Sequence, residues 1–201
     1  MTLTEWFSLA CILMLGAVSP GPSLALVIRN TSRSGPVTGL LTAIGHGAGV
    51  ALYALATAFF LGALLHSHPQ MLLVIKGIGI VCLLYFAWGA LRSQGISGLE
   101  SNASGPRRNG LLDGFLFSFT NPKLMLFFVA LFSPFLQEGF SVSDKLLITT
   151  TAGVIDGGWY ALVVLLISQP LIFRQLVRAG KWLDRAMGVV LLVVAGRLLL
   201  L

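Results

Sequence analysis

The residues of this sequence that could carry out chemistry are few, and they stand inside apolar stretches. Asp156 lies between Ile155 and a Gly-Gly pair, and His46 lies between two glycines. If these stretches span a membrane, a buried acid costs about 2.5–3.5 kcal/mol, so we expect Asp156 to face the interior of a helix bundle. It would exchange a proton or attract a substrate amine, the alternative being a structural ion pair with Lys76 or Lys123. His46 is either a proton relay or a packed residue bonded to a carbonyl.

Motifs that would support enzymatic chemistry are missing from the sequence. It contains no HExxH, no GxSxG and no Walker A pattern. Cys11 and Cys82 stand in apolar runs, without the spacing of a metal site or a disulfide framework. We therefore expect no enzyme, no metal and no cofactor. An integral-membrane enzyme and a non-transporting accessory subunit remain as alternative functions.

The composition indicates which elements must position Asp156 and His46. The chain has 201 residues, of which 56% are hydrophobic and 10% charged, and its mean hydropathy is +0.91. Soluble domains carry about 25% charged residues, so a water-soluble fold is excluded. Six stretches are apolar enough to span a bilayer, since a span needs about 20 such residues. They are Leu3 to Ile28, Val37 to Leu65, Met71 to Leu91, Leu111 to Phe135, Leu146 to Ser168, and Trp182 to Leu201.

The basic residues between these stretches predict an orientation. Nine lysines and arginines follow the first, third and fifth stretches: Arg29, Arg33, Arg92, Arg107, Arg108, Arg174, Arg178, Lys181 and Arg185. Positively charged loops stay in the cytoplasm, so we expect a multi-pass membrane protein with both termini outside. The net charge of +6 is then a mark of topology and predicts no nucleic-acid partner. The expected partners are membrane lipid, a small-molecule substrate and possible further copies of the chain.

The two halves of the sequence share features in the same order. Residues 1–92 and 110–201 each contain three apolar stretches, joined by a polar linker at residues 93–109. The first stretch of each half is interrupted by proline, and the second carries a glycine pair, Gly45 with Gly49 and Gly153 with Gly157. An odd number of spans inverts the second half in the membrane. The predicted fold is an all-α polytopic membrane protein with six transmembrane helices in two inverted three-helix repeats.

The proline breaks are the candidate binding elements. Proline frees backbone groups that lipid cannot satisfy, so such a break is expected to line a cavity, although a simple kink is the alternative. The helix start after a break also favours an anionic group such as a carboxylate. The candidate substrate-binding residues are Pro20, Gly21, Pro22, Ser23, Asn121, Pro122 and Lys123. The supporting residues are Lys76 and the two glycine pairs, with Asp156 and His46 as the proton-coupling residues.

These motifs together resemble those of the LysE/RhtB family of amino-acid exporters. The resemblance rests on Ser-Pro-Gly-Pro at 19–22, Gly-His-Gly-Ala-Gly at 45–49 and Asn-Pro-Lys at 121–123, and it runs along nearly the whole chain. Asp156 falls where many members have an aspartate. Val50, in contrast, stands where some members have an acidic residue, so a proton site with one carboxylate in each half is not implied. Membership implies six spans and secondary export of amino acids or related metabolites by proton antiport.

Overall fold

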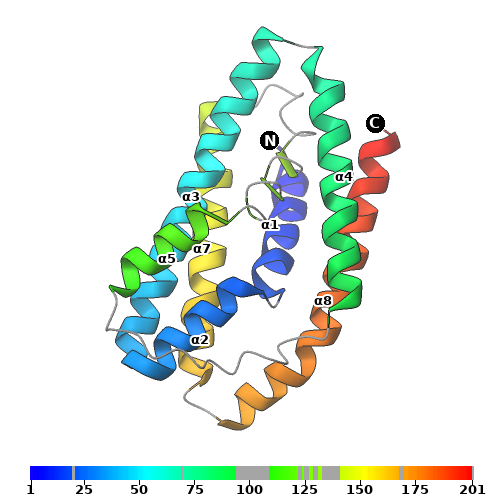
Figure 1. Cartoon of the computed structure of the whole chain (residues 1–201). Coiled ribbons are helices and arrows are strands. Elements are labelled where there is room, and N and C mark those ends of the chain that lie inside the picture. The colour runs from blue at the N-terminus through cyan, green and yellow to red at the C-terminus, as the bar shows by residue number, and fades with distance from the viewer. Residues whose placement is uncertain are drawn as a thin grey trace.

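The computed structural model of the chain is helical throughout the part that it describes. That part comprises residues 1–19, 21–68, 70–93, 109–121, 124, 127–128, 131–132, 141–167 and 170–200. Its helices are α1 (Leu3–Val18), α2 (Pro22–Ser34), α3 (Pro36–Ser67), α4 (Met71–Arg92), α5 (Gly110–Phe119), α7 (Val142–Ile167) and α8 (Pro170–Leu200). They form an elongated bundle in which α4 and α8 make a pair on one flank (Figure 1). The all-helical class expected from the sequence is confirmed.

The first proline motif separates α1 from α2, as the sequence predicts. α1 begins with a capping box in which Thr2 and Glu5 each accept a hydrogen bond from the other's backbone N–H. α1 ends at Val18, and Pro22 is the first residue of α2. Proline is favoured at the start of a helix and disfavoured in its interior, so this sequence ends one helix and begins the next. The two helix axes differ by 57°.

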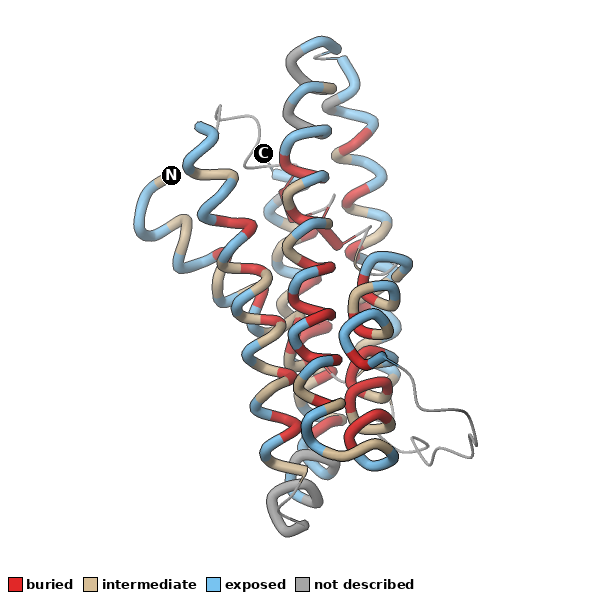
Figure 2. Tube along the Cα trace, turned by 90° about the vertical axis from the view of Figure 1, so that its left-hand side faces the viewer, coloured by how far each residue is buried: buried red, intermediate tan, exposed pale blue. Residues whose placement is uncertain are grey.

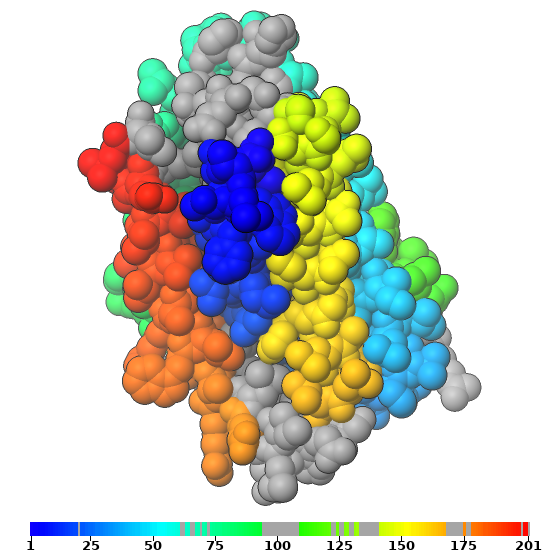
Figure 3. Space-filling view, turned by 180° about the vertical axis from the view of Figure 1, so that it is seen from behind, coloured from blue at the N-terminus to red at the C-terminus, as the bar shows by residue number. Residues whose placement is uncertain are grey.

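The centre of the bundle is formed by α3, which packs against both α5 and α7. α1 lies in the groove between α7 and α8 (Figure 3). Buried residues lie on the faces that helices turn toward one another, whereas the outer faces are exposed (Figure 2). Many exposed residues on these outer faces are large and apolar, among them Leu73, Val81, Val154 and Val193. An apolar outer surface of this kind is expected where lipid replaces water as the solvent.

Among the described residues, three helices are long and apolar enough to cross a bilayer, within Pro36–Phe60, Leu73–Arg92 and Val142–Ile167. The broken pair α1 and α2 adds a fourth if the pair is one span. The six spans predicted from the sequence are therefore not all recovered in the described part of the chain. α5 has only 10 residues. In α8 the apolar C-terminal half is interrupted by Asp184, Arg185 and Arg197.

One expectation about the connections is wrong. The basic segment between the fifth and sixth predicted spans, residues 169–181, is expected to be a loop, but residues 170–181 form the first part of α8. Pro170 begins this helix, where its fixed backbone angle is favourable. The leucines, alanines and basic residues that follow have good helix propensity, so the helix continues across the segment. The predicted 93–109 linker lies outside the described residues apart from its two ends.

Candidate functional site

A cavity of about 400 Å³ opens at the break between α1 and α2. This volume is in the range of small-molecule sites. Most of its wall is apolar, but the start of α2 also lines it, through Gly21, Pro22 and Ser23. Asn121, from the second predicted break, lines it as well. Four of the predicted binding residues therefore meet at one cavity, and the remaining three, Pro20, Pro122 and Lys123, lie outside the described residues.

Both predicted proton-coupling residues line the same cavity. His46 of α3 and Asp156 of α7 are joined by a contact of 2.6 Å between Nδ1 and Oδ2. Their exposed fractions are 1% and 6%, so the pair is sealed from solvent. The expected bond from His46 to a backbone carbonyl is thus replaced by a bond to a carboxylate. At this separation a single proton lies between the imidazole nitrogen and the carboxylate oxygen, so the two residues form one hydrogen-bonded pair.

Tyr160, one turn after Asp156 on α7, lies beside the pair. The ring of Tyr160 stands edge-on to His46, with 4.9 Å between centroids, and its hydroxyl is hydrogen-bonded to Ser23. Ser23 belongs to the first turn of α2, so the pair is connected through Tyr160 to the helix break. The other imidazole nitrogen, Nε2, is buried and has no hydrogen-bond partner among the described residues.

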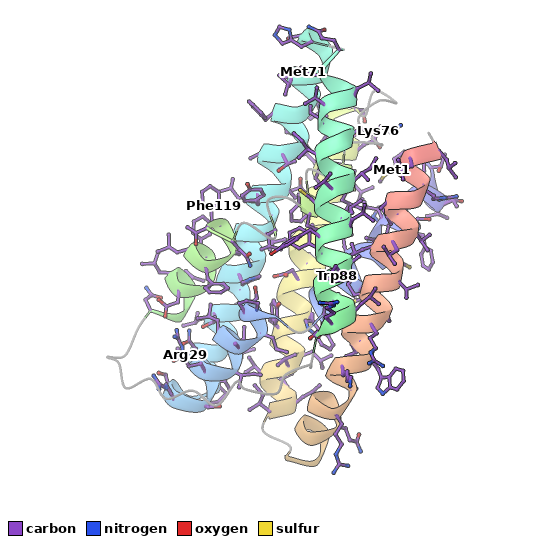
Figure 4. The ribbon with its side chains drawn as sticks, turned by 45° about the vertical axis from the view of Figure 1, so that its right-hand side comes forward. Met1, Arg29, Met71, Lys76, Trp88 and Phe119 are labelled. Atoms are coloured by element: carbon purple, nitrogen blue, oxygen red, sulfur yellow. The ribbon has the colours of Figure 1, made fainter. Side chains whose placement is uncertain are left out.

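Lys76, proposed as an alternative partner of Asp156, makes no ion pair with it. It does not line the cavity, whereas Trp88 of the same helix does. The two residues are 12 positions apart in α4, and a helix rises about 1.5 Å per residue, so roughly 18 Å of helix separates them. Figure 4 shows Lys76 toward the Met71 end of α4 and Trp88 toward the opposite end. Lys123, the other proposed partner, lies outside the described residues.

The glycines of α3 and α7 allow the two backbones to approach closely beside the ion pair. A Cβ on Gly47 would lie 2.7 Å from the carbonyl oxygen of Gly153 and 2.9 Å from the Cα of Gly157. Real Cβ atoms do not approach backbone this closely, so residue 47 must be glycine for this packing. The predicted pair Gly153 and Gly157 thus faces α3, but it meets Gly47. His46 precedes Gly47 in the chain, and the close contact holds its backbone against α7.

The predicted glycines Gly45 and Gly49 face another helix. A side chain on Gly45 would overlap the backbone of Leu111, and one on Gly49 would overlap Ser118, both residues of α5. On α5 the complementary small residues are Gly110, Gly114 and Ser118, which are all buried. The sequence analysis did not identify these three small residues of α5, although their spacing of four positions is visible in the sequence. α3 is therefore held by small residues on two faces.

A second carboxylate in the cavity was missed by the sequence analysis. Asp184 of α8 is 2% exposed and lines the cavity. Its Oδ1 accepts a hydrogen bond of 2.9 Å from the Ser19 hydroxyl, and its Oδ2 accepts one from the Ser93 hydroxyl. Ser19 follows the end of α1 and Ser93 follows the end of α4, so one side chain joins three helices. In the sequence Asp184 is the third residue of the predicted span Trp182 to Leu201 and stands beside Arg185, which places it in the basic end of that span.

The start of α2 presents a free backbone N–H group to the cavity. The first N–H groups of a helix have no acceptor within the helix, and they carry the positive end of its dipole. Gly21, which precedes α2, has no side chain to cap them, and no other described side chain caps this end. Pro22 has no N–H, which leaves that of Ser23, a residue of the cavity wall, as the donor. This end suits an anionic group of a ligand.

Comparison with known proteins identifies relatives over most of the chain. A family model described as LysE type translocator matches residues 14–201. The uncharacterized membrane protein YahN of Escherichia coli (strain K12) is 28% identical over 186 residues, which cover 90% of this chain and 82% of YahN. The threonine efflux protein of the same strain is 27% identical over 203 residues, covering 92% and 93% of the two chains. No solved structure matches the chain.

Proposed function

The chain belongs to the LysE type translocator family, and from this membership and its cavity we propose that it exports small amino acids by proton antiport. The members of this family are translocators, which move a solute across a membrane and are not enzymes. The amino-acid substrate is proposed because similar chains are named threonine efflux proteins. An amino acid of that size is also compatible with the cavity of about 400 Å³.

The observation that carries the proton step is the pair of Asp156 and His46 in the wall of that cavity. Both residues are buried, and only 2.6 Å separates Nδ1 from Oδ2. A buried ionised carboxylate is unfavourable unless a positive charge or a proton compensates it. Protonation of the pair therefore changes the charge of the cavity by one unit, and this change couples proton uptake to substrate release.

The start of α2 is proposed to receive the substrate carboxylate. The N–H group of Ser23 and the helix dipole act together on an anion at this position. Ser23 is also bonded to Tyr160, whose ring contacts His46. Substrate bound at the helix start is thus connected to the proton site through two side chains. Lys123 and Pro122 are proposed to complete the site from the second break, together with Asn121 and Pro20.

The proposed architecture is two inverted three-span repeats, residues 1–92 and 110–201, with a cytoplasmic linker between them. The packing supports it, because the second helices of the two halves, α3 and α7, pack together and so do the third helices, α4 and α8. We propose that the end of the bundle carrying Arg33, Arg92 and Arg185 faces the cytoplasm of a bacterial inner membrane. Both termini then lie outside, and rocking of one repeat against the other opens the cavity to alternate sides.

The test is transport by the full-length protein in proteoliposomes. Vesicles are prepared with a labelled amino-acid panel, threonine, serine, homoserine, lysine and leucine, with and without an imposed pH gradient. The proposal expects flux of a small hydroxylated or aliphatic amino acid that the gradient accelerates in the antiport direction. Flux that is independent of the gradient would exclude proton antiport. The absence of flux for every amino acid would exclude the proposed substrate class and favour an accessory role.

A matched pair of variants on α7 gives the internal control. Asp156→Asn removes the proton-binding carboxylate, whereas Asp144→Asn makes the same change near the start of the helix, outside the cavity. Asp144 pairs with the Met1 ammonium at 3.2 Å and bonds to Ser141. The first variant is expected to lose gradient-driven flux, and the second to keep it.

A further inference from the structure

Asp184 is a buried acid that has no basic partner among the described residues. No ion pair involves its carboxylate in the described part of the chain, and its two oxygens accept only the hydroxyls of Ser19 and Ser93. The neighbouring arginines are directed elsewhere. The guanidinium of Arg185 lies 5.3 Å from the ring centre of Trp182, and that of Arg92 lies 3.8 Å from the ring centre of Trp88.

The surroundings of this carboxylate favour a cation in the cavity. Two neutral hydroxyl groups leave the negative charge of a buried carboxylate largely uncompensated, which is unfavourable by several kcal/mol. The described residues that line the cavity include Asp184 and Asp156 but no lysine or arginine. Asp156 already has an imidazole at 2.6 Å, whereas Asp184 has no such partner. A ligand's positive charge would thus be more strongly stabilised at Asp184.

The position of Asp184 also fits the geometry of an amino acid. Ser19, its hydrogen-bond partner, stands three residues before Pro22 and the free N–H groups of α2. A group that binds a carboxylate, the start of α2, and a group that binds a cation, Asp184, thus lie at the same helix break. In an α-amino acid the ammonium and carboxylate groups share one carbon atom, so their binding groups must lie near each other.

From these observations we infer that Asp184 binds the ammonium group of the substrate, which replaces the hydroxyl contacts of Ser19 and Ser93. The inference rests on the proposed amino-acid export and assigns the two aspartates separate tasks. Asp184 holds the ammonium group, the start of α2 holds the carboxylate, and Asp156 with His46 exchanges the proton. Because Ser19 and Ser93 end α1 and α4, the exchange of partners also releases the ends of these two helices.

The experiment is equilibrium dialysis of the purified full-length protein with three labelled probes. These are L-threonine, the hydroxy acid in which a hydroxyl replaces the ammonium group, and the amino alcohol that lacks the carboxylate. The wild-type protein should bind threonine at least about 10-fold more tightly than the hydroxy acid, because a charge-assisted bond is lost. Asp184→Asn should weaken both ammonium-bearing probes by about 10-fold or more and leave the hydroxy acid within about two-fold. Asp144→Asn is the matched control and should bind all three as the wild type does.

Two results would overturn the inference. One is wild-type protein that binds the hydroxy acid as tightly as threonine, a measurement that needs no folded variant. The other is an Asp184→Asn protein that keeps its preference for the ammonium group. If Asp184→Asn does not fold, Asp184→Glu replaces it: the preference should persist with the longer carboxylate, and its loss would count against the inference. If the amino alcohol binds through Asp184 but the protein exports no amino acid, the proposed function is excluded and the assignment of Asp184 stands.

Discussion

Two aspartates line one cavity with similar burial, yet their surroundings differ. Asp156 is 6% exposed and touches an imidazole at 2.6 Å, whereas Asp184 is 2% exposed and accepts bonds from two serine hydroxyls. An imidazole titrates near neutral pH and a serine hydroxyl does not. The same residue type is therefore equipped for proton exchange at one place and for holding a cation at the other.

The helices around the two aspartates also pack differently. Near Asp156, α3 and α7 meet backbone to backbone at Gly47 and Gly153. Near Asp184, a Cβ on Gly188 of α8 would lie 2.7 Å from the Leu91 side chain and 3.1 Å from the carbonyl oxygen of Ala87. A side chain can change its rotamer, whereas a backbone contact yields only if a helix moves. The closest contact beside the proton site is thus made by backbone atoms, whereas the closest contact at Gly188 is made by a side chain that can adjust.

The largest effect is expected from Asp156→Asn. Without its carboxylate the pair no longer binds and releases a proton in the cycle, so gradient-driven accumulation of labelled threonine should fall by about 5- to 150-fold, the usual range of coupling between sites. Threonine–threonine exchange across the vesicle membrane needs no net proton movement and should continue at near the wild-type rate. The measurement is the ratio of gradient-driven flux to exchange. If the two fall together, the separation of tasks between Asp156 and Asp184 is wrong.

The second prediction concerns the contact between His46 and Asp156. The two groups act as one proton site, so His46→Gln should lower gradient-driven flux, and the double variant with Asp156→Asn should be no worse than Asp156→Asn alone. The interaction free energy from this cycle of flux ratios is expected to be about 1–3 kcal/mol. Asp184→Asn combined with His46→Gln supplies the comparison, because residues in separate clusters should have nearly additive effects. Additivity between His46 and Asp156 would show that their contact has no part in transport.

The third prediction tests the difference in packing. Gly47→Ala places a methyl group against the backbone of α7 and should destabilise the protein by about 1–3 kcal/mol, as measured by thermal unfolding in detergent. Gly188→Ala meets the Leu91 side chain at 2.7 Å and the Ala87 carbonyl oxygen only at 3.1 Å, so it should have a smaller effect. Gly158→Ala, with nothing within 4 Å of its added Cβ, is the control and should stay within about 0.5 kcal/mol. Equal losses for Gly47→Ala and Gly188→Ala would remove the proposed contrast in packing.

The smallest effect is expected from Tyr160→Phe. It removes the hydroxyl that bonds to Ser23 and keeps the ring that packs edge-on against His46. A hydrogen bond of this kind contributes about 0.5–1.5 kcal/mol, so the KM for export should rise by about two- to ten-fold. The pH dependence of the flux should be unchanged, since the proton site is intact. A shifted pH profile would mean that Tyr160 belongs to the proton site itself.

The sequence predicts the first of the two clusters well. A charge within an apolar stretch and a proline motif are local signals, and the cavity brings Asp156, His46 and Gly21–Ser23 together. The pairing of His46 with Asp156 was not predicted, because it joins residues 110 positions apart on different helices. Which glycines meet was likewise not visible, since Gly45, Gly47 and Gly49 differ only in the helix face that they occupy.

The second cluster could not be predicted, for a related reason. Asp184 stands beside Arg185 in a segment that looks solvated, and its burial depends on the continuation of α8 across that segment. Its partners, Ser19 and Ser93, are residues that end helices, a position where serine is common for local reasons. The sixth predicted span, Trp182 to Leu201, already contains Asp184 near its start. An acid within an apolar stretch was therefore the one local signal available.

The central claim, that a proton exchanges for an amino acid in this cavity, is tested most directly by proton movement in the absence of an imposed pH gradient. Proteoliposomes with an internal pH-sensitive dye are supplied with external threonine, and labelled uptake is followed in parallel. Antiport predicts that the interior becomes alkaline as threonine enters, at a rate proportional to uptake, and that Asp156→Asn vesicles show no such change. Uptake of threonine by the wild-type protein with a constant internal pH would contradict the claim.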